Sequence, residues 1–176
     1  MDDKLNKLST DTAATNRWQR ARGWLLNTVL LVAVGWGMHV WQTRDMLDQA
    51  ESVAPFQTVL LSGEAGLVAP DASRKTVLYF FAPWCGICRA SMGNLSSLDP
   101  AQIQVVVIAL DYDSRDEVQQ FMDDIGIDIP VHLGTPATRD FFRITAYPSY
   151  YVLDTDFRII GKSVGYSTAL GLSLRT

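Results

Sequence analysis

The hydrophobic pattern of the chain changes sharply along its length, and the first change marks a candidate membrane segment. Residues 24–41 contain no Asp, Glu, Lys or Arg. As a helix this run would be about 27 Å long, close to the hydrocarbon thickness of a bilayer. Trp24, Trp36 and Trp41 lie within the run and Trp18 precedes it, which is typical of indole rings at the lipid–water boundary. The pattern predicts one transmembrane helix.

Two later apolar runs, residues 76–82 and 103–110, show no polar alternation. Such runs are typical of strands buried on both faces of a parallel sheet. Each is followed by a helical pattern. In the second helix Ser114 and Glu117 have the spacing of a capping box, and Gly126 stands at the expected C-cap. This strand–helix–strand–helix order predicts an α/β fold with helices packed on the faces of the sheet.

Shorter segments on either side of this core predict two antiparallel hairpins. The first joins residues 56–61 to residues 67–68 through a glycine-containing turn, and the second joins residues 149–153 to residues 157–164. A short amphipathic helix is expected to close the domain at the C-terminus.

A further short helix is expected to begin at Thr135-Pro136, because proline is favoured at the first helical position, with Phe141 and Phe142 as its anchors in the core. The segment after the apolar run is polar and predicts a linker. The expected organisation is therefore a polar tail, a transmembrane helix, a linker and one globular domain, over residues 1–23, 24–41, 42–55 and 56–176.

The distribution of charge predicts the orientation of the transmembrane helix. Residues 1–44 carry six Lys or Arg and three Asp or Glu, whereas residues 45–176 carry nine and sixteen, so +3 and −7 give the net charge of −4. By the positive-inside rule, the tail is expected in the cytoplasm and the globular domain across the bacterial inner membrane, in the periplasm. A cleaved signal peptide is the alternative, although the apolar run is longer than the apolar region of a usual signal peptide and no clear small-x-small cleavage site follows closely.

Cys85 and Cys88 are the only cysteines, and they stand where the first buried strand gives way to a helix. The first turn of a helix offers unpaired N–H groups and the positive end of the helix dipole, which both stabilise a thiolate. Cys85 is therefore the expected nucleophile, and Cys88, one turn further on, can resolve the resulting mixed disulfide. This dithiol is the expected redox centre, and the sequence predicts no other cofactor.

Other interpretations of the pair remain open. A structural disulfide between Cys85 and Cys88 would close too small a loop to constrain the unfolded chain much. Zinc usually requires four ligands, and His132 is the only histidine outside the N-terminal apolar segment. A Cu(I) site formed by both thiolates and Met92 is the main alternative. Five aspartates lack the spacing of a calcium loop and predict a solvated acidic rim: Asp111, Asp113, Asp123, Asp124 and Asp128.

The residues around the cysteines, together with a second motif, resemble a known family. Trp84-Cys85-Gly86-Ile87-Cys88 stands at the strand-to-helix junction, and Tyr147-Pro148 precedes a later predicted strand. This combination resembles thioredoxin-fold proteins, and more narrowly the membrane-anchored TlpA/ResA/DsbE-type group and its ScsD-like disulfide oxidoreductases. The resemblance covers residues 56–176. It implies a central mixed sheet flanked by helices, with an N-terminal β-hairpin extension.

The resemblance also implies roles for particular residues. The peptide bond between Tyr147 and Pro148 is expected to be cis and to pack against the cysteines. Its unpaired backbone could then hold a partner chain as an added strand. Trp84, Tyr147 and Pro148 are the expected lining of this substrate groove.

The sequence departs from the family at several positions. Tyr79 stands where thioredoxins often have a buried acid, so the proton relay of that acid cannot be carried over. Ser91 and Gly93 replace an acidic residue and a proline that many relatives have in the first helix, and Ile87 replaces a common proline between the cysteines. The redox potential and the thiol pKa values of relatives therefore cannot be transferred to this chain.

Together, these features predict a membrane-anchored, periplasmic thiol–disulfide oxidoreductase. The expected partners are protein thiols and disulfides and a membrane thiol-redox protein, but no nucleic acid. The resemblance favours a reductase. The alternatives are an oxidase that donates its disulfide and, outside enzymes, a copper-binding module in copper tolerance.

Overall fold

The computed structural model describes the backbone of residues 2–166 and the side chains of residues 22–38 and 40–166. The amphipathic helix expected at the C-terminus lies outside the described residues. The chain divides into two compact units, one ending at Gln42 and the other beginning at Thr43.

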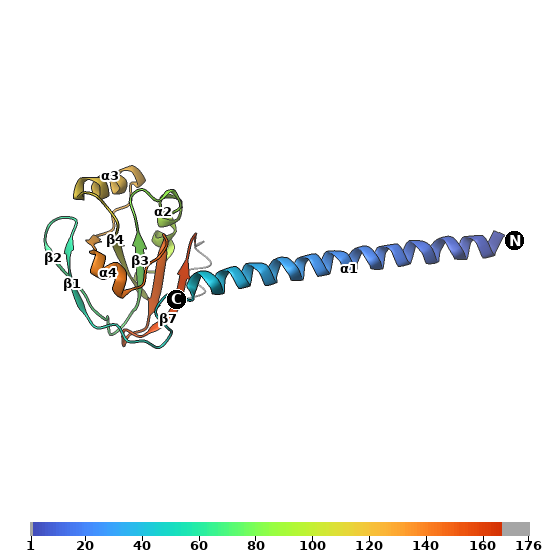
Figure 1. Ribbon diagram of the computed structural model, residues 1–176, viewed down its shortest axis with the longest axis horizontal. Coiled ribbons are helices and arrows are strands. Elements are labelled where there is room, and N and C mark those ends of the chain that lie inside the picture. Colours follow the sequence, from blue (N-terminus) through green and yellow to red (C-terminus); the bar gives the residue numbers. More distant parts are fainter. Residues whose placement is uncertain (1, 167–176) are drawn as a thin grey trace. The chain divides into compact units, whose positions relative to one another are not determined.

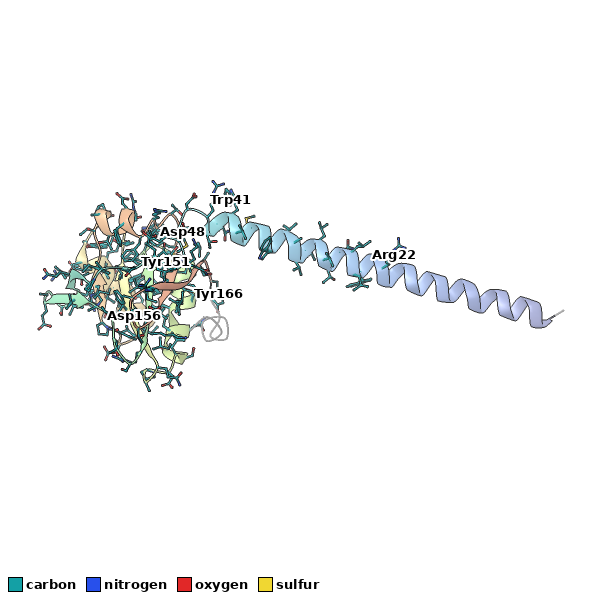
Figure 2. All side chains as sticks on the ribbon, turned by 90° about the horizontal axis from the view of Figure 1, so that it is seen from below. Arg22, Trp41, Asp48, Tyr151, Asp156 and Tyr166 are labelled. Carbon is teal, nitrogen blue, oxygen red and sulfur yellow. A yellow bond between two sulfur atoms is a disulfide. The ribbon has the colours of Figure 1, made fainter. Side chains whose placement is uncertain are left out.

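The first unit is a single helix, α1, which runs over Asp2–Thr43 and so includes the polar tail. Its segment Arg22–Thr43 has a mean hydropathy of 1.4 and is a candidate membrane span by length and composition. Figure 2 shows the side chains between Arg22 and Trp41 projecting outward from this helix. The Thr28 hydroxyl donates to the carbonyl of Trp24 at 2.8 Å, so this polar group is satisfied within the helix itself.

The second unit is built on one seven-stranded sheet with the order β2-β1-β5-β4-β3-β6-β7 (Figure 1). Strands β3, β4 and β5 pair in parallel, and the remaining pairs are antiparallel. This mixed sheet with a hairpin at its N-terminal end confirms the predicted fold class. The strands are β1 (Phe56–Leu60), β2 (Ala65–Val68), β3 (Lys75–Phe81), β4 (Ile103–Ala109), β5 (Val131–Leu133), β6 (Ser149–Leu153) and β7 (Ile159–Val164).

The short strand β5 was not expected from the sequence. Only three residues long, it pairs in parallel with β4 and antiparallel with β1. It thereby joins the N-terminal hairpin to the parallel part of the sheet. The hydroxyl group of Thr58 in β1 and Nδ1 of His132 in β5 lie 2.6 Å apart. His132 is buried, and burial lowers the pKa of its imidazole.

The helices of this unit are α2 (Gly86–Ser91), the 3₁₀ helix η1 (Met92–Ser97), α3 (Arg115–Ile125) and α4 (Pro136–Phe141). The caps of α3 form as predicted. Ser114 Oγ accepts from the N–H of Glu117 at 3.2 Å, and Gly126 ends the helix with φ +66°. The Glu117 carboxylate, however, accepts from the N–H of Asp113 at 2.8 Å, one residue before its usual partner in a capping box.

Strand β3 is buried on both faces and so divides the core into two layers. Val77, Tyr79 and Phe81 face a cluster that contains both cysteines and the apolar side of α3. Leu78 and Phe80 face the opposite cluster. The alternation is the consequence of strand geometry, in which successive side chains point to opposite faces.

Of the two phenylalanines predicted to anchor α4 in the core, only one is buried in this opposite cluster. Phe142 is buried, and its ring lies 4.9 Å from that of Phe80. Phe141, in contrast, is 53% exposed. Successive residues at the end of a helix point in different directions, so only one of the two reaches the core.

The segment predicted to be a linker, residues 42–55, also differs from expectation. Met46 and Leu47 are buried in the core of the globular unit, and the N–H of Val53 donates to the carbonyl of Phe157 at 2.9 Å. The apolar residues Met46, Leu47, Ala50, Val53 and Ala54 have helical spacing and favour a continuation of the preceding helix, but α1 ends at Thr43 and the segment packs as an irregular chain. The globular unit therefore begins near Thr43 rather than at residue 56.

Candidate active site

The two cysteines lie at the start of α2, directly after the loop that follows β3. Cys85 is the N-cap of this helix, with φ −83° and ψ 107°, and its Sγ accepts from the N–H of Cys88 at 3.2 Å. The two residues form a disulfide, with their Cα atoms 5.2 Å apart. The N–H that contacts the sulfur would also stabilise a Cys85 thiolate after reduction.

The two sulfur-bearing side chains differ in access to solvent. Cys85 is 8% exposed and Cys88 is fully buried. A disulfide on another protein can therefore reach Cys85 first. This difference is consistent with the expected roles, in which Cys85 attacks and Cys88 resolves the mixed disulfide.

Beneath α2, Tyr79 fills the position where many thioredoxins place an acid. Its hydroxyl lies 2.8 Å from Ser91 Oγ, and Ser91 Oγ donates to the carbonyl of Cys88 at 3.5 Å. Burial raises the pKa of Tyr79 to about 12. The phenol therefore remains protonated near neutral pH and cannot replace a carboxylate as a base.

The aromatic rings of Trp84 and Tyr147 pack against each other, and Trp84 directly precedes Cys85. The ring of Trp84 is 64% exposed and meets that of Tyr147 edge to face, with 5.6 Å between centroids. The peptide bond from Tyr147 to Pro148 is cis, as the resemblance implies, and Tyr147 packs against the cluster that holds both cysteines.

The backbone next to this bond is open to a partner. Within the described residues, neither the N–H nor the carbonyl of Tyr147 forms a hydrogen bond, whereas the carbonyl of Pro148 accepts from the N–H of Gly165 at 2.8 Å. An extended chain could thus pair with Tyr147 beside Cys85. The structure brings the predicted groove residues Trp84, Tyr147 and Pro148 together.

Two residues that sequence analysis did not assign to the site also belong to it. The carboxylate of Asp111 accepts from the hydroxyl of Tyr147 at 2.9 Å and from the guanidinium of Arg139 at 3.3 Å. The carbonyl of Asp111 accepts from Nε1 of Trp84 at 2.9 Å. A signal was present, because Asp111 follows a buried parallel strand, and the carboxyl ends of such strands meet at one edge of a sheet.

These contacts shift the ionisation of the groups involved. Burial and the neighbouring Asp111 carboxylate raise the pKa of Tyr147, and the same carboxylate raises the pKa of Arg139. Tyr147 and Arg139 therefore keep their usual protonation states near neutral pH.

Arg89 joins the cysteine helix to α3. Its guanidinium lies 3.0 Å from the Asp124 carboxylate and 4.9 Å from the centre of the Phe121 ring. Asp124 was expected only as part of a solvated acidic rim. The pair is about half exposed, so its contribution to stability is small.

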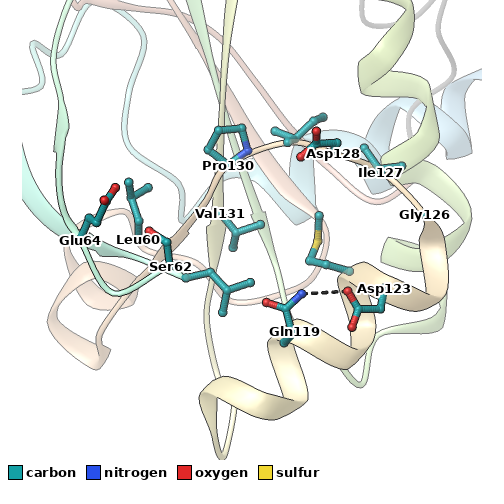
Figure 3. Close-up of a pocket in the computed structure, with 13 residues that line it drawn as sticks. Leu60, Ser62, Glu64, Gln119, Asp123, Gly126, Ile127, Asp128, Pro130 and Val131 are labelled. Carbon is teal, nitrogen blue, oxygen red and sulfur yellow. Dashed lines mark hydrogen bonds between the residues drawn. The ribbon is translucent and has the colours of Figure 1, made fainter.

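A cavity of about 450 Å³ is lined in part by Asp111, Arg139 and Tyr147. A second cavity, of about 740 Å³, lies between the turn after β1, the second half of α3 and the loop before β5 (Figure 3). It contains neither cysteine. Among the described residues, no cluster of three or more His, Cys, Asp or Glu side chains is arranged to hold a metal ion.

Comparisons with known proteins agree with this arrangement. A family model described as Redoxin matches residues 57–170. The thioredoxin-like protein YneN of Bacillus subtilis is 25% identical over 141 residues, which cover 74% of this chain and 83% of YneN.

Solved structures of several bacterial proteins share the fold. A putative thiol:disulfide interchange protein DsbE from Chlorobium tepidum superposes with a TM-score of 0.64 at 20% identity, over 73% of this chain and 93% of that one. StoA from Bacillus subtilis gives 0.61 at 22% identity, over 71% and 98% of the two chains. At these identities the structural similarities establish the fold of the chain.

Proposed function

The chain belongs to the Redoxin family and is a thioredoxin-like thiol–disulfide oxidoreductase, and we propose that it reduces disulfides of partner proteins in the periplasm while anchored in the bacterial inner membrane. The observation that carries the exchange chemistry is the unequal access to the two cysteines, beside a backbone segment that forms no hydrogen bond within residues 2–166. Cys85 is reachable, Cys88 is buried, and Tyr147 offers its N–H and carbonyl to an incoming chain.

In the reducing direction, the Cys85 thiolate attacks one sulfur of the partner disulfide. A mixed disulfide forms, and the second partner sulfur leaves as a thiolate, which takes up a proton. The Cys88 thiolate then attacks Sγ of Cys85, which releases the first partner sulfur as a thiol. Two electrons pass to the partner, and the Cys85–Cys88 disulfide of the structure is the product.

Turnover then requires a source of electrons. We propose a membrane thiol-redox protein as the donor that reduces the Cys85–Cys88 disulfide again. The direction of exchange is supported by the likeness to TlpA/ResA/DsbE-type proteins.

The membrane anchor is supported by α1. Its segment Arg22–Thr43 is long and apolar enough to cross a bilayer. Arg17, Arg20 and Arg22 lie at its N-terminal end, whereas Arg44 at the other end is followed by Asp45, Asp48 and Glu51. By the positive-inside rule, this charge difference favours a cytoplasmic N-terminus and an exported globular unit.

The deciding experiment is the equilibrium reduction potential of the full chain in detergent, measured against glutathione and dithiothreitol buffers, together with turnover of insulin disulfides. A potential near that of thioredoxin, about −270 mV, supports a reductase. A potential near that of DsbA, about −120 mV, would reverse the direction to disulfide donation. Stoichiometric Cu(I) binding without turnover would instead favour a copper-binding module.

Two variants make the turnover measurement specific to the cysteines. Cys85→Ser should abolish exchange, whereas Cys88→Ser should accumulate a mixed disulfide between Cys85 and the partner. Insulin turnover that survives in Cys85→Ser would contradict the proposal.

A further inference from the structure

Asp111 accepts hydrogen bonds from both Trp84 and Tyr147, and it uses a different oxygen for each. Its carbonyl accepts from the indole of Trp84, at 2.9 Å, and its carboxylate accepts from the hydroxyl of Tyr147, also at 2.9 Å. Trp84 belongs to the cysteine loop and Tyr147 to the loop before β6. One residue therefore links the two separate loops that flank the exposed sulfur.

The backbone of Asp111 is in the left-handed region, with φ +49°. Among residues with a side chain, aspartate and asparagine are those that adopt this conformation most readily. The position thus combines an unusual backbone with a charged side chain that has two partners. A substitution that keeps the backbone but removes the carboxylate can separate the two contributions.

The Asp111 carboxylate has a second partner, because Arg139 in α4 lies 3.3 Å from it. Arg139 also lies 3.6 Å from Asp140 on its own helix. A residue of α4 therefore also holds the carboxylate that accepts from Tyr147. This arrangement fixes where the phenol of Tyr147 can lie.

We propose that Asp111 is a positioning residue that sets the spacing of Trp84 and Tyr147 and thereby favours extended polypeptide segments over small disulfides as substrates. This inference rests on the proposed function and names its substrate class. A small disulfide needs only the sulfur of Cys85. An extended segment also needs the Tyr147 backbone and the apolar surface of Trp84 and of Ile87, which is 53% exposed.

A purely structural role for Asp111 fits the contacts less well. The side chain is exposed, and its partners Tyr147 and Arg139 are only partly buried. Neither Asp111 nor Arg139 belongs to the buried clusters on the two faces of the sheet. Loss of the carboxylate should therefore alter the groove more than the stability of the fold.

The test compares Asp111→Gly, Tyr147→Phe and the double variant in the full chain. Glycine adopts the left-handed backbone without strain, so Asp111→Gly removes the side chain with its carboxylate and keeps the backbone carbonyl. We expect KM for insulin to rise about five- to tenfold with kcat changed less than about twofold, and glutathione disulfide to react within about twofold of the parent rate. The double variant should be no worse than Asp111→Gly, because both changes remove the same hydrogen bond.

Asp113→Gly is the matched control, since it removes the same charge from an exposed position two residues further on. It should leave both substrates unaffected. Equal losses with insulin and glutathione disulfide in Asp111→Gly would overturn the proposal, as would an effect of Asp113→Gly as large as that of Asp111→Gly.

A spectroscopic measurement tests the positioning role of Asp111 independently of turnover. Trp84 is the only tryptophan after residue 41, so replacing the other four with Phe leaves it as the sole emitter. Asp111→Gly retains the carbonyl that accepts from Trp84 but removes the acceptor of the Tyr147 hydroxyl. Because the Trp84 ring packs on Tyr147, its fluorescence anisotropy should fall in Asp111→Gly and not in Asp113→Gly. Unchanged anisotropy in Asp111→Gly would overturn the positioning role, whether or not the protein turns over disulfides. Absence of disulfide turnover in the parent protein would contradict only the proposed function.

Discussion

The hydroxyl group of Tyr79 lies 2.8 Å from that of Ser91, one helical turn beyond the buried Cys88. This neutral pair occupies the two positions at which many relatives carry acids. Proton transfer to and from Cys88 therefore has no carboxylate in these positions, and the pH dependence of exchange should report the cysteine thiols alone.

The first prediction concerns this pair. Tyr79→Phe should leave the pH profile of exchange between about pH 6 and 9 unchanged, because burial raises the pKa of Tyr79 to about 12 and the phenol stays neutral in this range. The variant should lose about 1 kcal/mol of stability, since Ser91 loses the shorter of its two hydrogen bonds. Stopped-flow exchange and thermal unfolding measure the two effects.

Tyr151→Phe is a suitable control for this prediction. The Tyr151 hydroxyl is also buried, accepting from the N–H of Leu47 at 3.0 Å and donating to the carbonyl of Phe142 at 2.7 Å. It lies in the core cluster on the other face of the sheet from the cysteines, and Figure 2 labels it within the globular unit. A shift of the profile in Tyr79→Phe alone would show that Tyr79 does transfer a proton.

The second prediction follows from the unequal exposure of the two cysteines. After reduction, iodoacetamide should modify Cys85 and not Cys88 in the folded protein, because Cys88 is fully buried and only an accessible thiolate reacts. Mass spectrometry of the intact chain should show one added group, and a second only in denaturant. Cys85→Ser should remain unmodified while folded; rapid labelling of this variant would mean that α2 opens in the reduced state.

The third prediction concerns acid stability. Burial lowers the pKa of His132 below its ordinary value, so the unfolded chain binds a proton at higher pH than the folded one. The stabilisation by neutral His132 is complete above about pH 6.5 and is lost as the pH falls through the lower folded pKa. Unfolding midpoints of the globular unit should therefore fall between about pH 7 and 5.

His132→Gln tests whether this residue causes the acid-dependent loss. Gln can still bond to the hydroxyl of Thr58 but does not titrate, so the slope of stability against pH should flatten over this range. An unchanged slope would assign the loss to the carboxylates of the domain instead.

The fourth prediction tests the orientation proposed for α1. In cells with a permeabilised outer membrane, a maleimide that cannot cross the inner membrane should label reduced Cys85, because the globular unit is proposed to lie outside the cytoplasm. Replacing Arg17, Arg20 and Arg22 with Glu should reduce this labelling by weakening the positive-inside signal. Labelling that requires lysis of the inner membrane would contradict the orientation.

Much of the fold could be predicted because its signals are local. The uninterrupted apolar run that became β3 and the caps Ser114 and Gly126 of α3 each depend on a few neighbouring residues. Strand β5 has only three residues and is defined by its partners β1 and β4. A segment of that length carries too little pattern to be recognised without them.

The site was predictable to the extent that its chemistry resides in residue types. Two cysteines and a Tyr-Pro pair are conspicuous, whereas Asp111 was one of five similar aspartates. What distinguishes Asp111 is a left-handed backbone and contacts with Trp84 and Tyr147. These are tertiary relationships between residues far apart in the chain, and the spacing of the aspartates does not encode them.

Phe80 in β3 pairs with Ser149 in β6, so the chain reaches Cys85 and Pro148 from neighbouring points on one edge of the sheet. Strands advance by about 3.4 Å per residue, and a shift of this pairing by two residues would displace the proline relative to the sulfur by about 7 Å. The pairing of β3 with β6 in the interior thus sets the distance between Cys85 and Pro148 at the surface. The cysteine motif and the Tyr147-Pro148 motif should therefore work in another protein only when they are transferred together with β3 and β6.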